Sequence, residues 1–181
     1  MVENIIAAFN KNFAGYDVNI EAVVGDVSGP EGYKVSGKKS GSRIDAQIIY
    51  KNQNAVRYAL NQLLTFAKSE KTVFAYESAP DFPVRGVVEG FYGKPWSHDQ
   101  RLRAIEHFGD FKFNTYFIAP KDVPWQRFNW RQPFNDEFMK LMAELIATGN
   151  ENGIAVTACV SPGLSVKYSD LTDVQAVITR F

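Results

Sequence analysis

The sequence predicts an α/β protein in which a small α+β domain precedes a parallel sheet covered by helices. The chain has 181 residues, of which 45% are hydrophobic and 22% charged, as is ordinary for a globular protein. Two prolines in the segment 79–83 interrupt regular structure and predict a domain boundary. After this segment, short apolar strands alternate with helices, which is typical of a parallel sheet between helical layers.

The first predicted domain, residues 1–82, mixes helices and strands. Apolar faces at helical spacing predict its helices, and alternating apolar and polar side chains predict its strands. The composition of Gly37–Ser42 predicts a turn between the second and third strands. The predicted elements are helices at Asn4–Phe13 and Asn54–Lys68 and strands at Val18–Val24, Tyr33–Val35 and Ile44–Tyr50.

The second predicted domain, residues 83–181, repeats a strand followed by a helix. Ser97 with Gln100, and Thr172 with Gln175, have the spacing of capping boxes at helix starts. The predicted elements are strands at Val84–Glu89, Thr115–Ala119 and Ala155–Val160 and helices at Ser97–Phe111, Asp136–Asn152 and Thr172–Phe181.

Composition argues against several classes of partner. The 20 basic and 20 acidic residues balance, which gives no support for a nucleic-acid or membrane-surface partner. No segment has the roughly 18 apolar residues of a membrane span. The single cysteine, Cys159, excludes an internal disulfide and a cysteine-based zinc site, and two histidines, His98 and His107, leave little for a histidine metal site. The first ten residues lack signal-peptide features, so the sequence as it stands predicts a cytoplasmic chain, and the compartment of a longer parent protein stays open.

The carboxyl ends of the three strands in the second domain are the predicted site. In parallel α/β folds, functional groups gather at these ends. The ends are Glu89–Gly93, Ala119–Asp122 and Ser161–Gly163, and they include Tyr92 and Lys121. For each loop alone a simple turn is the favoured explanation, but three loops on one rim favour a site. Polar donors beside an aromatic ring suit a sugar or a phosphorylated metabolite, and the residues alone do not separate these ligands.

Four blocks of sequence carry a resemblance to a known family. "RGVVEGFYGKPWSHDQR", "NTYFIAPKD", "WRQPF" and "SPGLSVKY" resemble glycoside hydrolase family 84, the β-N-acetylglucosaminidases that remove O-linked N-acetylglucosamine (GlcNAc) from proteins and include bacterial hyaluronidases. The resemblance implies the first three βα units of a TIM (β/α)8-type barrel, truncated, after a small hexosaminidase-type domain. A complete barrel takes about 250 residues, and fewer than half as many follow Pro83.

The resemblance assigns substrate-binding roles to three residues and implies no metal or organic cofactor. The position of Gly90 contacts a sugar hydroxyl through its backbone, that of Tyr92 forms a wall of the pocket, and that of Lys121 donates to sugar hydroxyls. The implied partner is a glycan or glycoprotein that contains GlcNAc. One departure is visible, because Val123 stands where the family usually has a second acid.

The implied reaction is substrate-assisted hydrolysis with retention, in which an adjacent Asp-Asp pair orients the acetamide and transfers the proton. The chain contains no Asp-Asp. Asp136-Glu137 open a helix, where acids favour the positive end of the dipole, and the family pattern makes Glu89 a structural neighbour of Gly90. We therefore expect no catalytic residue in this chain, the Asp-Asp pair beyond Phe181, and an inactive fragment.

Two further expectations concern the chain as a whole. Three parallel strands leave an open sheet edge, which predicts self-association. The alternative to an enzyme fragment is a non-catalytic α/β module that binds a sugar or a phosphorylated small molecule.

Overall fold

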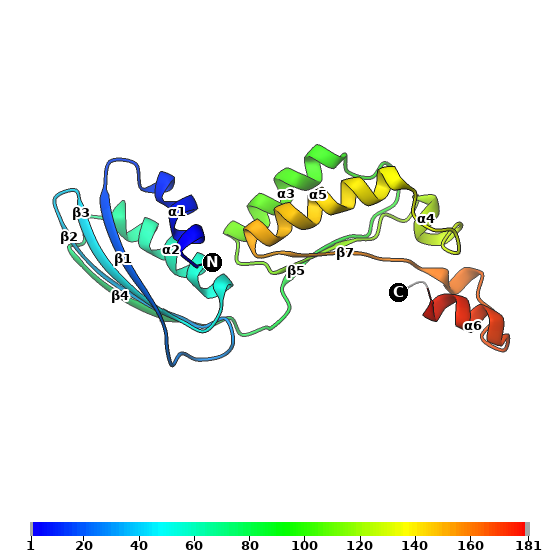
Figure 1. The fold of residues 1–181 in the computed structure, drawn as a ribbon, viewed down its shortest axis with the longest axis horizontal. Helices are drawn as coiled ribbons and strands as arrows, with labels where there is room; N and C mark the ends of the chain where they lie inside the picture. Colours follow the sequence, from blue (N-terminus) through cyan, green and yellow to red (C-terminus); the bar gives the residue numbers. More distant parts are fainter. Residues whose placement is uncertain (1, 180–181) are drawn as a thin grey trace. The chain divides into compact units, whose positions relative to one another are not determined.

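The structure is a computed structural model that describes residues 2–179 and divides into two compact units. The division falls between Pro83 and Val84, and each unit has its own sheet and its own hydrophobic core (Figure 1). The chain is thus a mixed α/β protein, as predicted.

The first unit contains a four-stranded sheet in the order β1-β3-β2-β4. β1 runs parallel to β3, and the other two pairings are antiparallel. Apolar side chains from the sheet pack against two helices, with residues such as Ile44, Ile48 and Leu60 fully buried. The elements are α1 (Val2–Asn10), the 3-10 helix η1 (Lys11–Phe13), β1 (Asp17–Val24), β2 (Tyr33–Ser40), β3 (Arg43–Tyr50), α2 (Gln53–Ala67) and β4 (Val73–Ser78).

One prediction for this unit was wrong, and one of its strands was not predicted. The segment predicted as a turn continues β2 to Ser40, because Lys38 pairs with Asp45 in the register of β3, and the reversal needs only the residues around Gly41. Gly41 has φ +60°, which glycine tolerates best. The strand β4 was not predicted because its residues Val73–Tyr76 are all apolar and lack the alternation of a half-buried strand, although Phe74 stacks on the core residue Phe66 at 5.0 Å between ring centroids.

The second unit contains three parallel strands in the order β5-β6-β7, which confirms the predicted parallel pairing. Helices α3 and α5 lie on one side of this sheet (Figure 1). They pack on Tyr116 and Ile118 through Ile105, Met142 and Leu145. The elements are β5 (Gly86–Glu89), α3 (His98–Asp110), β6 (Thr115–Ile118), α4 (Pro124–Arg127), α5 (Asp136–Asn152), β7 (Ala155–Ala158), the 3-10 helix η2 (Pro162–Leu164) and α6 (Leu171–Ile178).

Helix caps explain where the helices of this unit begin. Ser97 accepts from the amide of Gln100, whose side chain accepts from the amide of Ser97, so the predicted capping box is confirmed. The predicted box at Thr172 was wrong, because Asp170 caps α6 by accepting from the amide of Thr172. The carboxylate at position 170 competes successfully since it lies directly before the first helical residue. The last two residues of that predicted helix lie outside the described residues.

The other face of the β5-β6-β7 sheet carries no helical layer within the described residues. The side chain of Val88 is 61% exposed there, next to Phe117 and Thr157 in the strand register. The sheet is therefore a partial α/β barrel wall and not a closed barrel.

Candidate functional site

The loops after β5 and β6 are held together at the carboxyl ends of their strands. The amide of Ala119 donates to the carbonyl of Glu89, and the amide of Lys121 donates to the carbonyl of Phe91, both at 3.1 Å. The Asp122 carboxylate accepts from the amide of Gly93 at 2.6 Å. These bonds place the predicted residues Gly90, Tyr92 and Lys121 on adjacent loops at one end of the sheet.

The two residues predicted in the first loop differ in exposure. Gly90 is half-buried, and its amide donates to the carbonyl of Val88 at 2.9 Å. A Cβ atom added at Gly90 would lie 3.3 Å from a methyl group of Val88, which is a tight contact that only a small shift of Val88 would relieve. Tyr92 is 68% exposed, and its ring centroid lies 5.9 Å from the guanidinium carbon of Arg127.

The third loop, which follows β7, reaches the same rim. The amide of Cys159 donates to the carbonyl of Ile118 at 2.9 Å, and the amide of Ser161 donates to the carbonyl of Gln126 at 2.6 Å. Burial raises the pKa of the Cys159 thiol, and the nearby positive charge of Lys121 opposes this rise. The bond from Cys159 to Ile118 joins the carboxyl ends of β6 and β7, and Lys121 lies in the loop that follows β6. Whether the predicted residues converge on one concavity stays a prediction.

Glu89 is fully buried at this rim, and every contact made by its carboxylate is structural. Arg101 binds it as a fork, with Nε donating to Oε2 and Nη2 to Oε1, both at 2.8 Å. The hydroxyl of Tyr116 donates to Oε2 at 2.6 Å, and the amide of Trp96 donates to Oε1 at 3.1 Å. A carboxylate with these donors is neutralised by its neighbours and has no exposed surface for a substrate.

The partners of Glu89 show the effect of the buried charge on their own titration. Burial opposes the positive charge of Arg101, but its hydrogen bonds and attraction to Glu89 still raise its pKa. Burial and the Glu89 carboxylate together raise the pKa of Tyr116 well above its usual value. The three groups thus form one stable arrangement of carboxylate, guanidinium and phenol.

The remaining acids near the rim have other surroundings. Asp136 and Glu137 occupy the first turn of α5 and are exposed, directly after the cap Asn135. Within residues 2–179, the His, Cys, Asp and Glu side chains form no group of three suited to a metal ion. No helix in the described part of the chain is long and apolar enough to cross a membrane.

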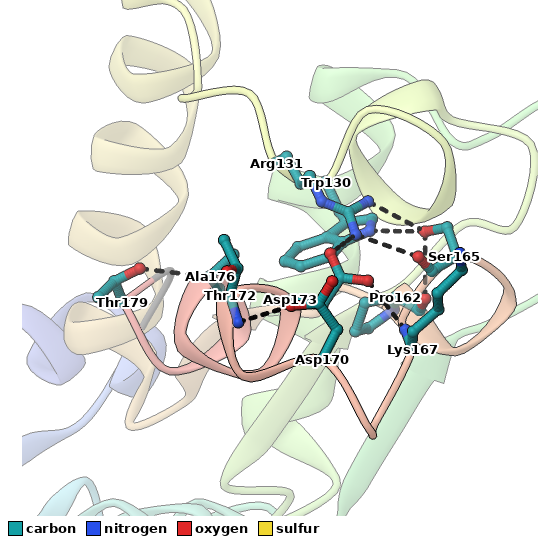
Figure 2. A network of polar contacts seen from close by, with 10 residues as sticks. All are labelled: Trp130, Arg131, Pro162, Ser165, Lys167, Asp170, Thr172, Asp173, Ala176 and Thr179. Atoms are coloured by element: carbon teal, nitrogen blue, oxygen red, sulfur yellow. Dashed lines mark hydrogen bonds and ion pairs between the residues drawn. The ribbon is translucent and has the colours of Figure 1, made fainter.

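Two tertiary contacts of the rim loops were not apparent from the sequence. One is the bond between Asp122 and the amide of Gly93, and the other is a polar network that joins Arg131 to Ser165 and Asp173 (Figure 2). Both connect residues from separate motifs, so no spacing within one motif predicts them.

Comparisons with known proteins agree on one family. The family described as beta-N-acetylglucosaminidase matches residues 85–181. The chain is 36% identical over 92 residues to Protein O-GlcNAcase of Rattus norvegicus, a match that covers 51% of this chain and 10% of the rat protein. The solved structure of CpGH84B has 33% identity and a TM-score of 0.74, and the match covers 86% of this chain and 28% of that one.

A third comparison concerns the fold alone. The structure of CpGH84D has 20% identity and a TM-score of 0.75, and the match covers 99% of this chain and 36% of that one. Both units therefore have counterparts in a solved structure. The chain spans about a tenth of the length of the rat relative and under a third of CpGH84B.

Proposed function

The chain belongs to the β-N-acetylglucosaminidase family, glycoside hydrolase family 84, and on this premise we propose that it supplies part of the sugar-binding site of such an enzyme. The substrate is a terminal β-linked GlcNAc on a glycan or glycoprotein. The observation that carries the proposal is the pairing of the rim loops, which places Gly90, Tyr92 and Lys121 at one end of the sheet.

Each of these residues has a distinct role in the proposal. The backbone of Gly90 hydrogen-bonds a sugar hydroxyl, and the ring of Tyr92 covers one side of the sugar. The ammonium group of Lys121 donates to further hydroxyls. The buried Glu89 stays with Arg101 and Tyr116 and holds the start of this rim in shape.

The proposed reaction is substrate-assisted hydrolysis with retention, in which the acetamide oxygen of the sugar attacks its own anomeric carbon. Two carboxylates are needed, one to orient the acetamide and one to protonate the leaving oxygen and then activate water. The sequence of this chain has no adjacent Asp-Asp pair to supply them. We therefore expect the 181-residue chain alone to bind the sugar without hydrolysing it.

Binding by this part of the site alone is weak. A sugar held on one side stays largely hydrated, so the dissociation constant is about 1 mM or weaker, which corresponds to about −4 kcal/mol. Self-association is also part of the proposal, because β7 is an edge strand of its sheet within residues 2–179 and an edge can pair with a second copy.

Titration of the ¹⁵N-labelled chain with GlcNAc, followed by NMR, tests the proposal. We expect the amide signals of Gly90, Gly93 and Lys121 to shift at millimolar sugar. Lys121→Met removes an ammonium donor to hydroxyls and should abolish the shifts at the same concentration, whereas Lys140→Met, at an exposed position on α5, should retain them.

Two results would count against this function. Shifts that survive Lys121→Met unchanged would place the sugar elsewhere. Stronger binding of glucose 6-phosphate than of GlcNAc at the same amides would favour the alternative module that binds phosphorylated molecules.

A further inference from the structure

We propose that Arg131 is a positioning residue that holds the loop after β7 in place as the third wall of the sugar site. This inference rests on the proposed function, because it assigns a task to the loop that contains Ser161–Gly163. Arg131 itself lies in the segment between β6 and α5 and follows the fully buried Trp130.

The guanidinium of Arg131 contacts the loop directly. Figure 2 shows it beside Ser165, where Nη2 donates to the backbone carbonyl at 3.1 Å and Nη1 reaches the hydroxyl oxygen at 3.4 Å. The same group stacks on the indole of Trp130, with the guanidinium carbon 4.4 Å from the ring centroid. A planar guanidinium with several donors can make these contacts together, whereas an ammonium group cannot reproduce their geometry.

Trp130 provides the fixed base of this arrangement. Its side chain has no exposed surface, and its indole nitrogen donates to the Ser165 hydroxyl oxygen at 2.8 Å. A buried indole needs such an acceptor to offset the loss of water. Ser165 is therefore held from two adjacent residues, Trp130 and Arg131.

Asp173 extends the contact to the start of α6. Its carboxylate accepts from Nη2 of Arg131 at 2.5 Å and from the amide of Lys167 at 2.9 Å. The contact with Arg131 is an ion pair. The contact with the Lys167 amide links the segment after the loop to the first turn of α6. Arg131 thus fixes both the end of the loop and the helix that follows it.

The position of the loop connects these contacts to the site. Its first residue, Ser161, donates its amide to the carbonyl of Gln126, and the amide of Cys159, directly after the end of β7, donates to the carbonyl of Ile118 in β6. The segment 126–131 therefore holds the loop at its start through Gln126 and at its end through Trp130 and Arg131. Loss of Arg131 releases the end of the loop, which is then held only at its start, and a loop held at one end is a less rigid wall for a sugar.

Amide hydrogen exchange and GlcNAc titration of the 181-residue chain together test the positioning role of Arg131. We expect Arg131→Met to speed exchange at the indole N–H of Trp130 and the amide of Lys167 about five- to tenfold, since it removes hydrogen bonds from a charged, partly exposed group. The GlcNAc shifts should weaken in parallel. Arg131→Lys should restore only part of both effects, and Arg103→Met, at an exposed position on α3, should change neither.

Asp173→Asn keeps the size of the side chain and gives a second test if Arg131→Met does not fold. It should speed exchange at Lys167 and leave the amide of Ala119, in the paired loops, unchanged. Exchange at wild-type rates in both variants would overturn the proposal. A loosened loop with unchanged GlcNAc shifts would also overturn the positioning role. A wild-type chain that binds no GlcNAc would contradict the proposed function and the role of the loop as a wall of the sugar site. The exchange rates would still decide whether Arg131 holds the loop.

Discussion

Glu89 shows at the scale of one residue how partners decide what a carboxylate can do. It stands directly before Gly90 at the rim, where an acid invites a catalytic interpretation. Both carboxylate oxygens of Glu89 accept hydrogen bonds from the Arg101 guanidinium, and one of them also accepts from the Tyr116 hydroxyl. Breaking a buried ion pair by removing one charge leaves the other uncompensated, so the energetic role of this group can be measured as stability.

Glu89→Gln should lower the free energy of unfolding of residues 84–181 by about 3 kcal/mol, because it leaves the Arg101 charge half-buried and unpaired. Tryptophan fluorescence during urea denaturation measures this unit alone, since Trp96, Trp125 and Trp130 are the only tryptophans of the chain. Glu106→Gln, at an exposed position on α3, is the matched control and should cost less than about 0.5 kcal/mol. Equal stability of the two variants would show that the buried network does not support the rim.

At the scale of elements, the sequence predicted most of the second unit because its signals are local. Ser97 with Gln100 marks a helix start, and apolar runs mark strands. Two predictions were wrong because a neighbouring residue or strand decided the local structure. Asp170, and not Thr172, caps α6. The lysines before Gly41 pair with β3, where composition indicated a turn. Only one face of such a strand is buried, so the residues on the other face can be polar. A strand rich in polar residues then has the composition of a loop.

Gly86→Ala should weaken the pairing of β5 with β6. A Cβ atom at this position would lie 1.9 Å from the carbonyl oxygen of Thr115, and backbone atoms of a paired strand cannot withdraw without breaking the ladder. We expect a loss of about 3 kcal/mol in the stability of residues 84–181, measured by the same fluorescence method. Gly163→Ala, where nothing lies within 4 Å of the added atom, should have little effect. Similar stability of both variants would contradict the register of β5 and β6.

The loop before α6 should respond to acid through Asp173. The amide of Lys167 and then the guanidinium of Arg131 lower the pKa of this carboxyl below its ordinary value of 3.8. A lowered folded-state pKa means that the stabilisation is complete above the ordinary value and is lost as pH falls through the lowered pKa. The amide signal of Lys167 followed by NMR between neutral pH and pH 2 should therefore show one transition on the acid side of 3.8.

Two variants separate this carboxyl from its neighbour. Asp173→Asn should remove the transition, whereas Asp170→Asn should keep it, because asparagine caps a helix as well as aspartate does. A transition that persists in Asp173→Asn would assign the acid response to another group.

At the scale of the whole molecule, the open edge of β7 and the uncovered face of its sheet should promote self-association. Sedimentation velocity should show larger species as the chain concentration rises. Thr157→Lys places a charge on this edge strand and should shift the distribution toward monomer. Thr65→Lys adds the same charge to the exposed surface of α2 and should leave it unchanged. Concentration-independent monomers of the wild type would contradict the proposed association.

The candidate site was predictable from sequence only in its parts. The motifs around Gly90, Tyr92 and Lys121 each indicated a strand end, and parallel pairing explains why they share one rim. The contacts that position the loops, from Asp122 to Gly93 and from Arg131 to Asp173, join residues 29 and 42 positions apart, and no local pattern encodes them. A tertiary structure is needed to bring such residues together.

We propose that this chain holds part of a GlcNAc site without the carboxylate pair that hydrolysis needs. Release of 4-nitrophenol from 4-nitrophenyl N-acetyl-β-glucosaminide by the purified 181-residue chain tests it most directly, with Protein O-GlcNAcase as the positive control. General acid–base catalysis alone contributes roughly 10²–10⁴-fold, and an acetamide that is not oriented loses its proximity advantage as well. We expect no release above the buffer rate. Turnover comparable to the control would contradict the account, because it would require a catalytic group within these 181 residues.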